Sequence, residues 1–91
     1  MDKFEEVHLQ YDKFRIKSHF NFVKANPRMN TKMRNKKFSE LIQNYDLLYY
    51  TFCDLVKTYK KSNILEQEKK LIEINDIIEL MKKFESINSS F

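Results

Sequence analysis

The sequence predicts an all-α fold, and three observations lead to that prediction. The chain of 91 residues contains no glycine and one proline, so it lacks the residues that tight turns between β-strands require. Apolar residues recur at steps of three and four rather than alternating. Lys, Glu, Leu and Ile, which suit helices, are abundant. We therefore expect a single domain, residues 1–91, in which three long helices at about 2–25, 31–60 and 64–87 form a bundle that dimerisation could complete.

Two breaks separate the three predicted helices. Pro27 has no backbone N–H and restricts Asn26 before it, so the first helix ends there. Asn63, followed three residues later by Glu66, is typical of a helix N-cap with its capping-box partner. The chain between these two breaks is therefore one long helix.

The predicted helix 31–60 has the most regular apolar pattern. Its apolar side chains alternate steps of three and four residues, as in a long helix with one face in a bundle core. The stripe consists of Phe38, Leu41, Tyr45, Leu48, Phe52, Leu55 and Tyr59, with Ile42, Tyr49 and Val56 beside it. Leu47 and Tyr50 lie off the stripe, one turn apart. They are either isolated surface side chains or a small contact patch for another chain.

The predicted helix 2–25 is apolar on two nearly opposite faces. The first face consists of Phe4, Val7, Tyr11, Phe14 and Phe22. The second face consists of Leu9, Ile16, Phe20 and Val23. A surface helix needs only one apolar face. Either the helix bends or breaks near Ser18, or it lies centrally between the other two, or its second face binds a partner.

The predicted helix 64–87 broadens its apolar surface toward the C-terminus. One stripe consists of Ile64, Leu71, Ile74, Ile78 and Met81, and a second of Ile77, Leu80, Phe84 and Ile87. A monomeric bundle uses part of this surface, and a self-associating bundle would use more of it.

Charge is distributed very unevenly along the chain. Residues 13–39 contain nine basic residues and no acid, whereas the remaining chain has eight basic and thirteen acidic residues. Such a region attracts polyanions, of which nucleic-acid backbones are the commonest inside cells. The candidate nucleic-acid-binding residues are Lys13, Arg15, Lys17, Lys24, Arg28, Lys32, Arg34, Lys36 and Lys37.

Other uses for this charge stay open. The cations could form a solvated face, or pair across the bundle with acids of the last helix: Glu66, Glu68, Glu73, Asp76 and Glu79. They could also bind an acidic protein or an anionic membrane surface. Aromatic residues are interleaved with the cations, and Phe20 and Phe22 cannot face the same way, so one of them is free to stack on an unpaired base.

The sequence offers little for catalysis. Glu5 and His8 have the spacing of di-iron bundles, but those sites need a second such pair, so we interpret His8 as a surface histidine. Cys53 has no second cysteine and no nearby histidine, and a glycine-rich phosphate loop is impossible without glycine. We expect no enzymatic activity, no metal and no cofactor.

Cysteine content and hydropathy indicate a cytoplasmic protein. The lone Cys53 cannot form an internal disulfide, no secretory-type apolar run opens the chain, and no stretch reaches the roughly 20 apolar residues of a membrane span. Abundant Lys, Asn and Ile are typical of AT-rich genomes, such as those of low-GC bacteria and their phages and plasmids.

These patterns predict a small basic helical protein that contacts nucleic-acid phosphates through residues 13–39, as a regulator or accessory subunit. The alternative is an inhibitor, adaptor or immunity-type bundle that docks on a protein. Its candidate partner-binding residues are Leu9, Ile16, Phe20, Val23, Leu47 and Tyr50.

Overall fold

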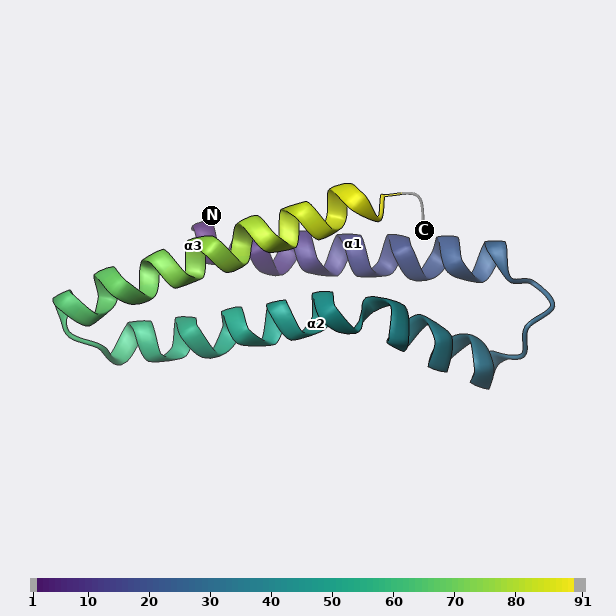
Figure 1. Ribbon diagram of the computed structural model, residues 1–91, viewed down its shortest axis with the longest axis horizontal. Helices are drawn as coiled ribbons and strands as arrows, with labels where there is room; N and C mark the ends of the chain where they lie inside the picture. Colours follow the sequence, from purple (N-terminus) through teal and green to yellow (C-terminus); the bar gives the residue numbers. More distant parts are fainter. Residues whose placement is uncertain (1, 90–91) are drawn as a thin grey trace.

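The protein folds as three antiparallel helices, as a computed structural model describes it for residues 2–89. The helices are α1 (Lys3–Ala25), α2 (Thr31–Lys61) and α3 (Ile64–Ile87), and no strand occurs within the described residues. The prediction of an all-α three-helix bundle is confirmed (Figure 1). Each observed helix boundary lies within one residue of its predicted position.

Each helix begins at an Asp or Asn side chain. Asp2 accepts a hydrogen bond from the backbone N–H of Glu5, Asn30 from that of Met33, and Asn63 from that of Glu66. These caps satisfy backbone donors that a helix start leaves without an intrahelical partner. The helix starts are therefore encoded locally, and one of these caps, Asn63, was predicted from the sequence.

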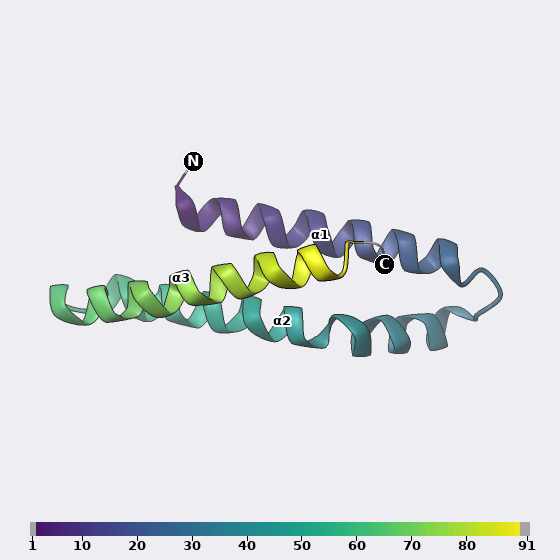
Figure 2. The same cartoon turned by 45° about the horizontal axis from the view of Figure 1, so that its top comes forward.

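The longest helix, α2, spans most of the molecule and contacts both other helices. Its 31 residues extend about 46 Å, in a molecule that measures 53 × 21 × 21 Å. Figures 1 and 2 show that α1 and α3 are displaced along α2 in opposite directions. The bundle is therefore staggered: both helices lie beside the middle of α2, whereas α3 alone covers one of its ends and α1 alone covers the other (Figure 1).

Aromatic rings join α1 to α2. Tyr11 of α1 stacks on Tyr49 with ring centroids 3.7 Å apart, and Phe4 meets Phe52 and Tyr59 edge-on at 5.9 and 5.8 Å. Isoleucine and methionine side chains of α3 fill the rest of the core between the helices. The buried apolar core consists of Val7, Tyr11, Phe38, Ile42, Tyr45, Phe52, Val56, Ile74, Ile78 and Met81.

The first helix is neither broken nor central. It continues without interruption through Ser18, whose small side chain is buried with an exposed fraction of 2%. Of the alternatives left open by the sequence, a break at Ser18 is therefore excluded. A central position for α1 is excluded as well, because α2 is the helix that packs extensively on both others, whereas within residues 2–89 α1 meets α3 through a few side chains. The second apolar face of α1 stays on the surface, where Leu9, Ile16 and Phe20 are exposed.

Four residues of the predicted apolar stripes are also exposed: Leu41, Ile64, Leu80 and Ile87. Phe84 in the last turn of α3 stacks on Tyr45, with ring centroids 5.1 Å apart, and α3 ends at Ile87. Leu41 lies one turn before Tyr45 on α2, where α3 is ending, and it is exposed. Ile64 is exposed in the first turn of α3, at the end of the molecule where α2 and α3 extend past the start of α1 (Figure 1).

Beyond the end of α3, only α1 and α2 continue. We call residues 13–39 the cationic arm: they comprise the second half of α1, the loop at 26–30 and the first turns of α2. Figure 1 shows these two helices running on together past the end of α3. Most of the region without acids in the sequence therefore forms a two-helix projection, and its beginning lies beside the end of α3, where Phe14 meets Phe84.

Side chains also tie α1 directly to α3. The amide of Gln10 donates a hydrogen bond to the Glu85 carboxyl, and Phe14 meets Phe84 edge-on. Burial raises the pKa of Glu85, although its hydrogen bond from Gln10 acts in the opposite direction. Burial, followed by the charge of Glu85, raises the pKa of the Tyr45 phenol.

The raised pKa of Glu85 predicts that Glu85→Gln changes how stability depends on pH. Because the folded state favours the protonated carboxyl, Glu85 contributes stability below its unfolded pKa and loses that contribution as pH rises through its folded pKa. Wild type should gain stability relative to Glu85→Gln as pH falls from about 7 to about 4. Urea unfolding of both proteins measures this difference, with the exposed Glu73→Gln as control. Parallel pH profiles for wild type and Glu85→Gln would contradict the prediction.

Candidate nucleic-acid interface

The nine predicted phosphate-binding cations all lie on the cationic arm, and most of them reach solvent. Seven are exposed, and Arg15 and Arg34 are half-buried. The exposed residues are Lys13, Lys17, Lys24, Arg28, Lys32, Lys36 and Lys37. The fold therefore gathers this charge at one end of the molecule.

Among the described residues, few acids form ion pairs with these cations. Within residues 2–89, Arg15 with Asp46 is the one ion pair that involves an arm cation, and the other ion pair joins Lys82 to Glu79 on α3. The acids expected to pair across the bundle lie between the first and the fifth turn of α3, which starts at the end of the molecule opposite the arm (Figure 1). The interpretation that the arm cations pair with acids of α3 is therefore wrong. Because α3 is displaced along α2, these acids lie away from the arm.

The position of the cations on α2 also costs stability. A helix N-terminus carries partial positive charge, so cations in the first turn are unfavourable, an effect that fades beyond that turn. No acid lies in the first turn of α2, whereas Lys32, Arg34, Lys36 and Lys37 lie in its first two turns. At these positions the four cations do not stabilise α2.

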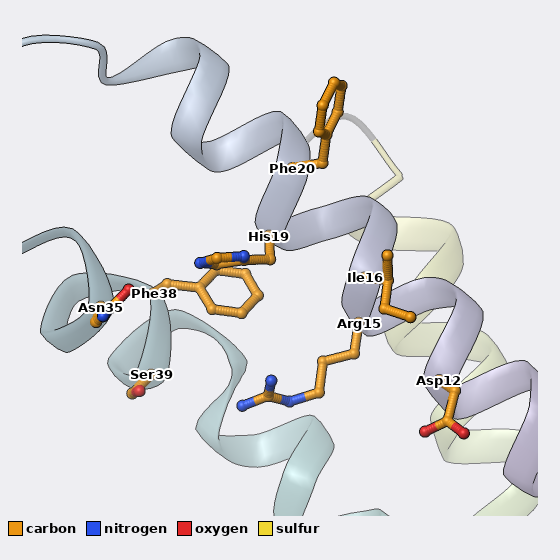
Figure 3. Close-up of a pocket in the computed structure, with 8 residues that line it drawn as sticks. All are labelled: Asp12, Arg15, Ile16, His19, Phe20, Asn35, Phe38 and Ser39. Atoms are coloured by element: carbon orange, nitrogen blue, oxygen red, sulfur yellow. The ribbon is translucent and has the colours of Figure 1, made fainter. Parts of the chain in front are cut away.

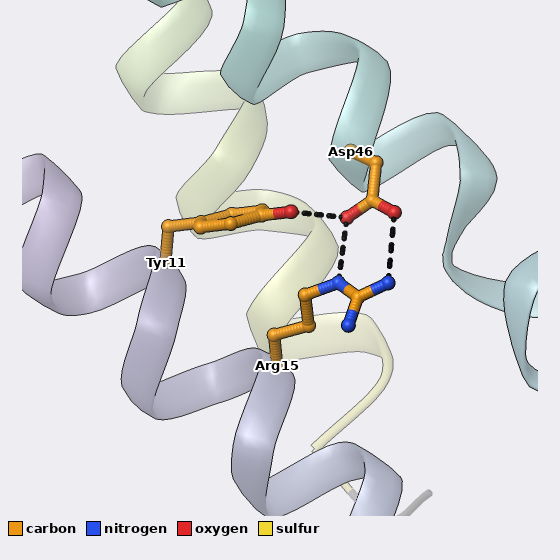
Figure 4. A network of polar contacts seen from close by, with 3 residues as sticks. All are labelled: Tyr11, Arg15 and Asp46. Atoms are coloured by element: carbon orange, nitrogen blue, oxygen red, sulfur yellow. Dashed lines mark hydrogen bonds and ion pairs between the residues drawn. The ribbon is translucent and has the colours of Figure 1, made fainter.

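Arg15 differs from the other cations because it has a structural partner. Its Nε and Nη2 donate to the two oxygens of Asp46 at 3.1 and 3.3 Å, and the Tyr11 hydroxyl donates to the same carboxylate at 2.6 Å (Figure 4). The hydrogen bond with Asp46 raises the pKa of Arg15, and burial followed by the hydrogen bond to Asp46 raises the pKa of Tyr11. This network fixes α1 to α2 where the arm begins, so Arg15 anchors the arm.

His8 is also part of the packing between α1 and α2. Its Nδ1 lies 2.6 Å from the Tyr49 hydroxyl, and its ring meets Phe52 edge-on. Burial, then the neighbouring Cys53, raises the pKa of Tyr49 to about 12. The interpretation of His8 as a surface histidine is therefore wrong. Across residues 2–89, no three His, Cys, Asp or Glu side chains gather as a metal ion would require.

A groove of about 540 Å³ lies between α1 and α2 in the arm. From α1 it is lined by Asp12, Arg15, Ile16, His19 and Phe20, and from α2 by Asn35, Phe38 and Ser39. Figure 3 shows the Arg15 guanidinium extending toward α2 and the His19 ring lying over Phe38, where the ring centroids are 4.9 Å apart. The groove thus combines aromatic side chains with several hydrogen-bonding groups.

The two phenylalanines between the arm cations do face different ways. Phe22 is half-buried and packs near Phe38, with ring centroids 5.8 Å apart. Phe20 points away from α2 (Figure 3), has an exposed fraction of 61% and lies 5.5 Å from the Lys24 ammonium. Phe20 is therefore the ring that is free for contact with a ligand.

The residues predicted to bind a protein partner lie at two places. Leu9, Ile16, Phe20 and Val23 lie along the outer side of α1, where Val23 is half-buried and the other three are exposed. Leu47 and Tyr50 lie on α2, with exposed fractions of 55% and 58%. The structure thus leaves most of these side chains open to solvent.

Sequence reasoning missed four polar residues of the groove: Asp12, His19, Asn35 and Ser39. Asn35 and Ser39 are one turn apart on α2, and Asp12 and His19 are two turns apart on α1, but nothing in the spacing along the chain links the two helices. Only the alignment of α1 against α2, which depends on the aromatic contacts, brings them together.

None of the helices within residues 2–89 is both long and apolar enough to cross a lipid bilayer. Comparison of the chain with protein-family models, with curated proteins and with solved structures gives no match.

Proposed function

We propose that this protein binds nucleic acid through the cationic arm, mainly by contacts to phosphates. One observation supports the proposal most strongly: among nine cations on the arm, Arg15 alone forms an ion pair within the described residues. Uncompensated positive charge at one end of a molecule attracts polyanions, and phosphate contacts account for most of the affinity of such proteins.

The principal contacts in this proposal are near the tip of the arm. Arg28 lies in the loop, and Lys32, Lys36 and Lys37 lie in the first two turns of α2, all exposed. Flexible lysines bind phosphates as point charges rather than by reading base edges. The expected role is a regulator or accessory subunit of low-GC bacterial, phage or plasmid type, with binding of low sequence specificity and no catalytic step.

The test is fluorescence anisotropy with labelled DNA and RNA oligonucleotides at about 50 and 200 mM salt. If six or more phosphates are contacted, affinity should fall by about 10³-fold or more over this range, because each contact releases condensed counterions. Each cation that makes a contact should contribute about 0.9 to the slope of log affinity against log salt on a duplex, and about 0.7 on a single strand. Absence of binding at the lower salt would overturn the proposal.

A second candidate function is docking on another protein, as an inhibitor, adaptor or immunity-type bundle. It is favoured by the exposed apolar side chains of α1 and by Leu47 and Tyr50 on α2. The partner would be a protein with an acidic rim, whose charge complements the arm, or a second copy of this chain in a homodimer. Failure of every nucleic acid to bind at low salt would direct attention to this candidate.

A further inference from the structure

We infer that the arm receives unpaired bases, at Phe20 and in the adjacent groove, and therefore binds single-stranded nucleic acid in preference to duplex. This inference rests on the proposed function. It adds a preference for single strands. Phosphate contacts alone would not produce this preference, because a duplex and a single strand both present phosphates.

Phe20 is an aromatic platform beside a cation. Its ring is exposed, makes no ring-to-ring contact within the described part of the chain and has the Lys24 ammonium 5.5 Å from its centroid. Proteins that bind single strands combine exposed aromatic rings, on which bases stack, with cations that follow the backbone. A base on Phe20 would place its phosphate within reach of Lys24.

The groove beside Phe20 offers hydrogen-bonding groups that are not used inside the protein. His19, Asn35 and Ser39 have no side-chain hydrogen bond to any of residues 2–89, and neither does Nη1 of Arg15. The Asn35 amide and the Ser39 hydroxyl can each donate and accept, so they can pair with the edge of any base. This versatility fits binding without strong sequence preference.

Charge favours a base rather than a phosphate in this groove. Asp12 lines the groove, and Asp46 compensates the charge of Arg15. Both carboxylates repel a phosphate, whereas Asp12 can accept a hydrogen bond from a base amino group. Phosphates would follow the lysine-bearing outer side of α1 instead, along Lys13, Lys17 and Lys24. Bases in a duplex are stacked and paired, so only an unpaired base can enter the groove.

Two substitutions of Phe20 test this inference by anisotropy at about 50 mM salt, with a single strand and a hairpin duplex of equal phosphate number. Wild type should prefer the single strand. Phe20→Ala should weaken single-strand binding roughly 5- to 150-fold, the range expected for loss of one stacked base, and leave duplex binding within about 2-fold. Because Phe20 is exposed, the thermal unfolding midpoint should change little.

Phe20→Trp should keep the single-strand affinity and report stacking directly. The chain contains no tryptophan, so the new indole is the sole source of tryptophan emission. Its fluorescence should be quenched by the single strand and not by the duplex. Tyr50→Trp, at a similarly exposed position on α2, is the matched control and should not be quenched by either.

Each contrary result has a distinct meaning. Equal binding of both forms, with Phe20→Ala unchanged and Phe20→Trp unquenched, overturns this inference while leaving the proposed function in place. Equal weakening of both forms by Phe20→Ala assigns Phe20 to the structure of the arm and also overturns it. No binding of either form overturns the inference together with the proposed function, and leaves the outer side of α1 to a protein partner.

Discussion

Replacing Phe52 by alanine is expected to bring the protein close to unfolding. Phe52 has no exposed surface and packs against aromatic rings of both α1 and α2, including Phe4, His8 and Tyr49. Phe→Ala in a packed core costs about 3–5 kcal/mol, because apolar burial is reduced and a cavity is left behind. Small domains have only about 5–15 kcal/mol of total stability, so one substitution should remove a large part of it.

Urea unfolding followed by circular dichroism measures the effect, with Tyr50→Ala as the control. Tyr50 is an aromatic residue two positions away on the same helix, but more than half of it is exposed. Its replacement should change the free energy of unfolding by less than about 1 kcal/mol. Similar destabilisation of both variants would mean that α2 does not bury Phe52 in the way described.

Neutralising the end of the arm should have the largest effect on binding. The five substitutions Arg28→Gln, Lys32→Gln, Arg34→Gln, Lys36→Gln and Lys37→Gln remove charge that no ion pair within residues 2–89 uses. We expect affinity for a single strand at about 50 mM salt to fall by at least roughly 100-fold, and the salt slope to shrink by about 0.7 for each phosphate that the variant no longer neutralises. The fold should be kept, because none of the five side chains is part of the buried core, and Lys32 and Arg34 in the first turn oppose the dipole of α2.

The matched control removes five cations from the other end of the molecule. Lys57, Lys60, Lys61, Lys69 and Lys70, on α2 and α3, are replaced by glutamine. Both variants then have the same net charge, so a difference between them reports the location of the charge and not its total. An equal decrease of affinity in the two variants would show that attraction depends on net charge alone and would remove the arm from its assigned role.

The parts of the fold that depend on local chemistry could be predicted from the sequence. Helix ends followed from Asn63 and Pro27, because capping and the proline restriction act within a few residues. The position of the cations on one projection could not be predicted, since it depends on where α3 stops along α2. The same displacement exposes Leu41, which the apolar spacing alone had assigned to the core.

Residues with two plausible roles were the hardest to assign. Arg15 belongs to the run of cations in the sequence, but the structure places it in the Asp46 network, where it also lies 5.7 Å from the Phe38 ring. A bend or break at Ser18 was one explanation for apolar residues on two nearly opposite faces of the first helix. In the structure the second face is solvent-exposed along a continuous helix, which a spacing argument cannot distinguish from a bend.

The most direct test of the central claim, that the cationic arm is the nucleic-acid site, is an NMR titration of the ¹⁵N-labelled protein with a short single-stranded oligonucleotide. Amide shifts should concentrate in residues 13–39, with large changes around Phe20 and from Arg28 to Lys37, and small changes from Lys57 to Asp76. Shifts centred on Leu47 and Tyr50 or on the acidic half of α3, with the arm unchanged, would contradict the claim.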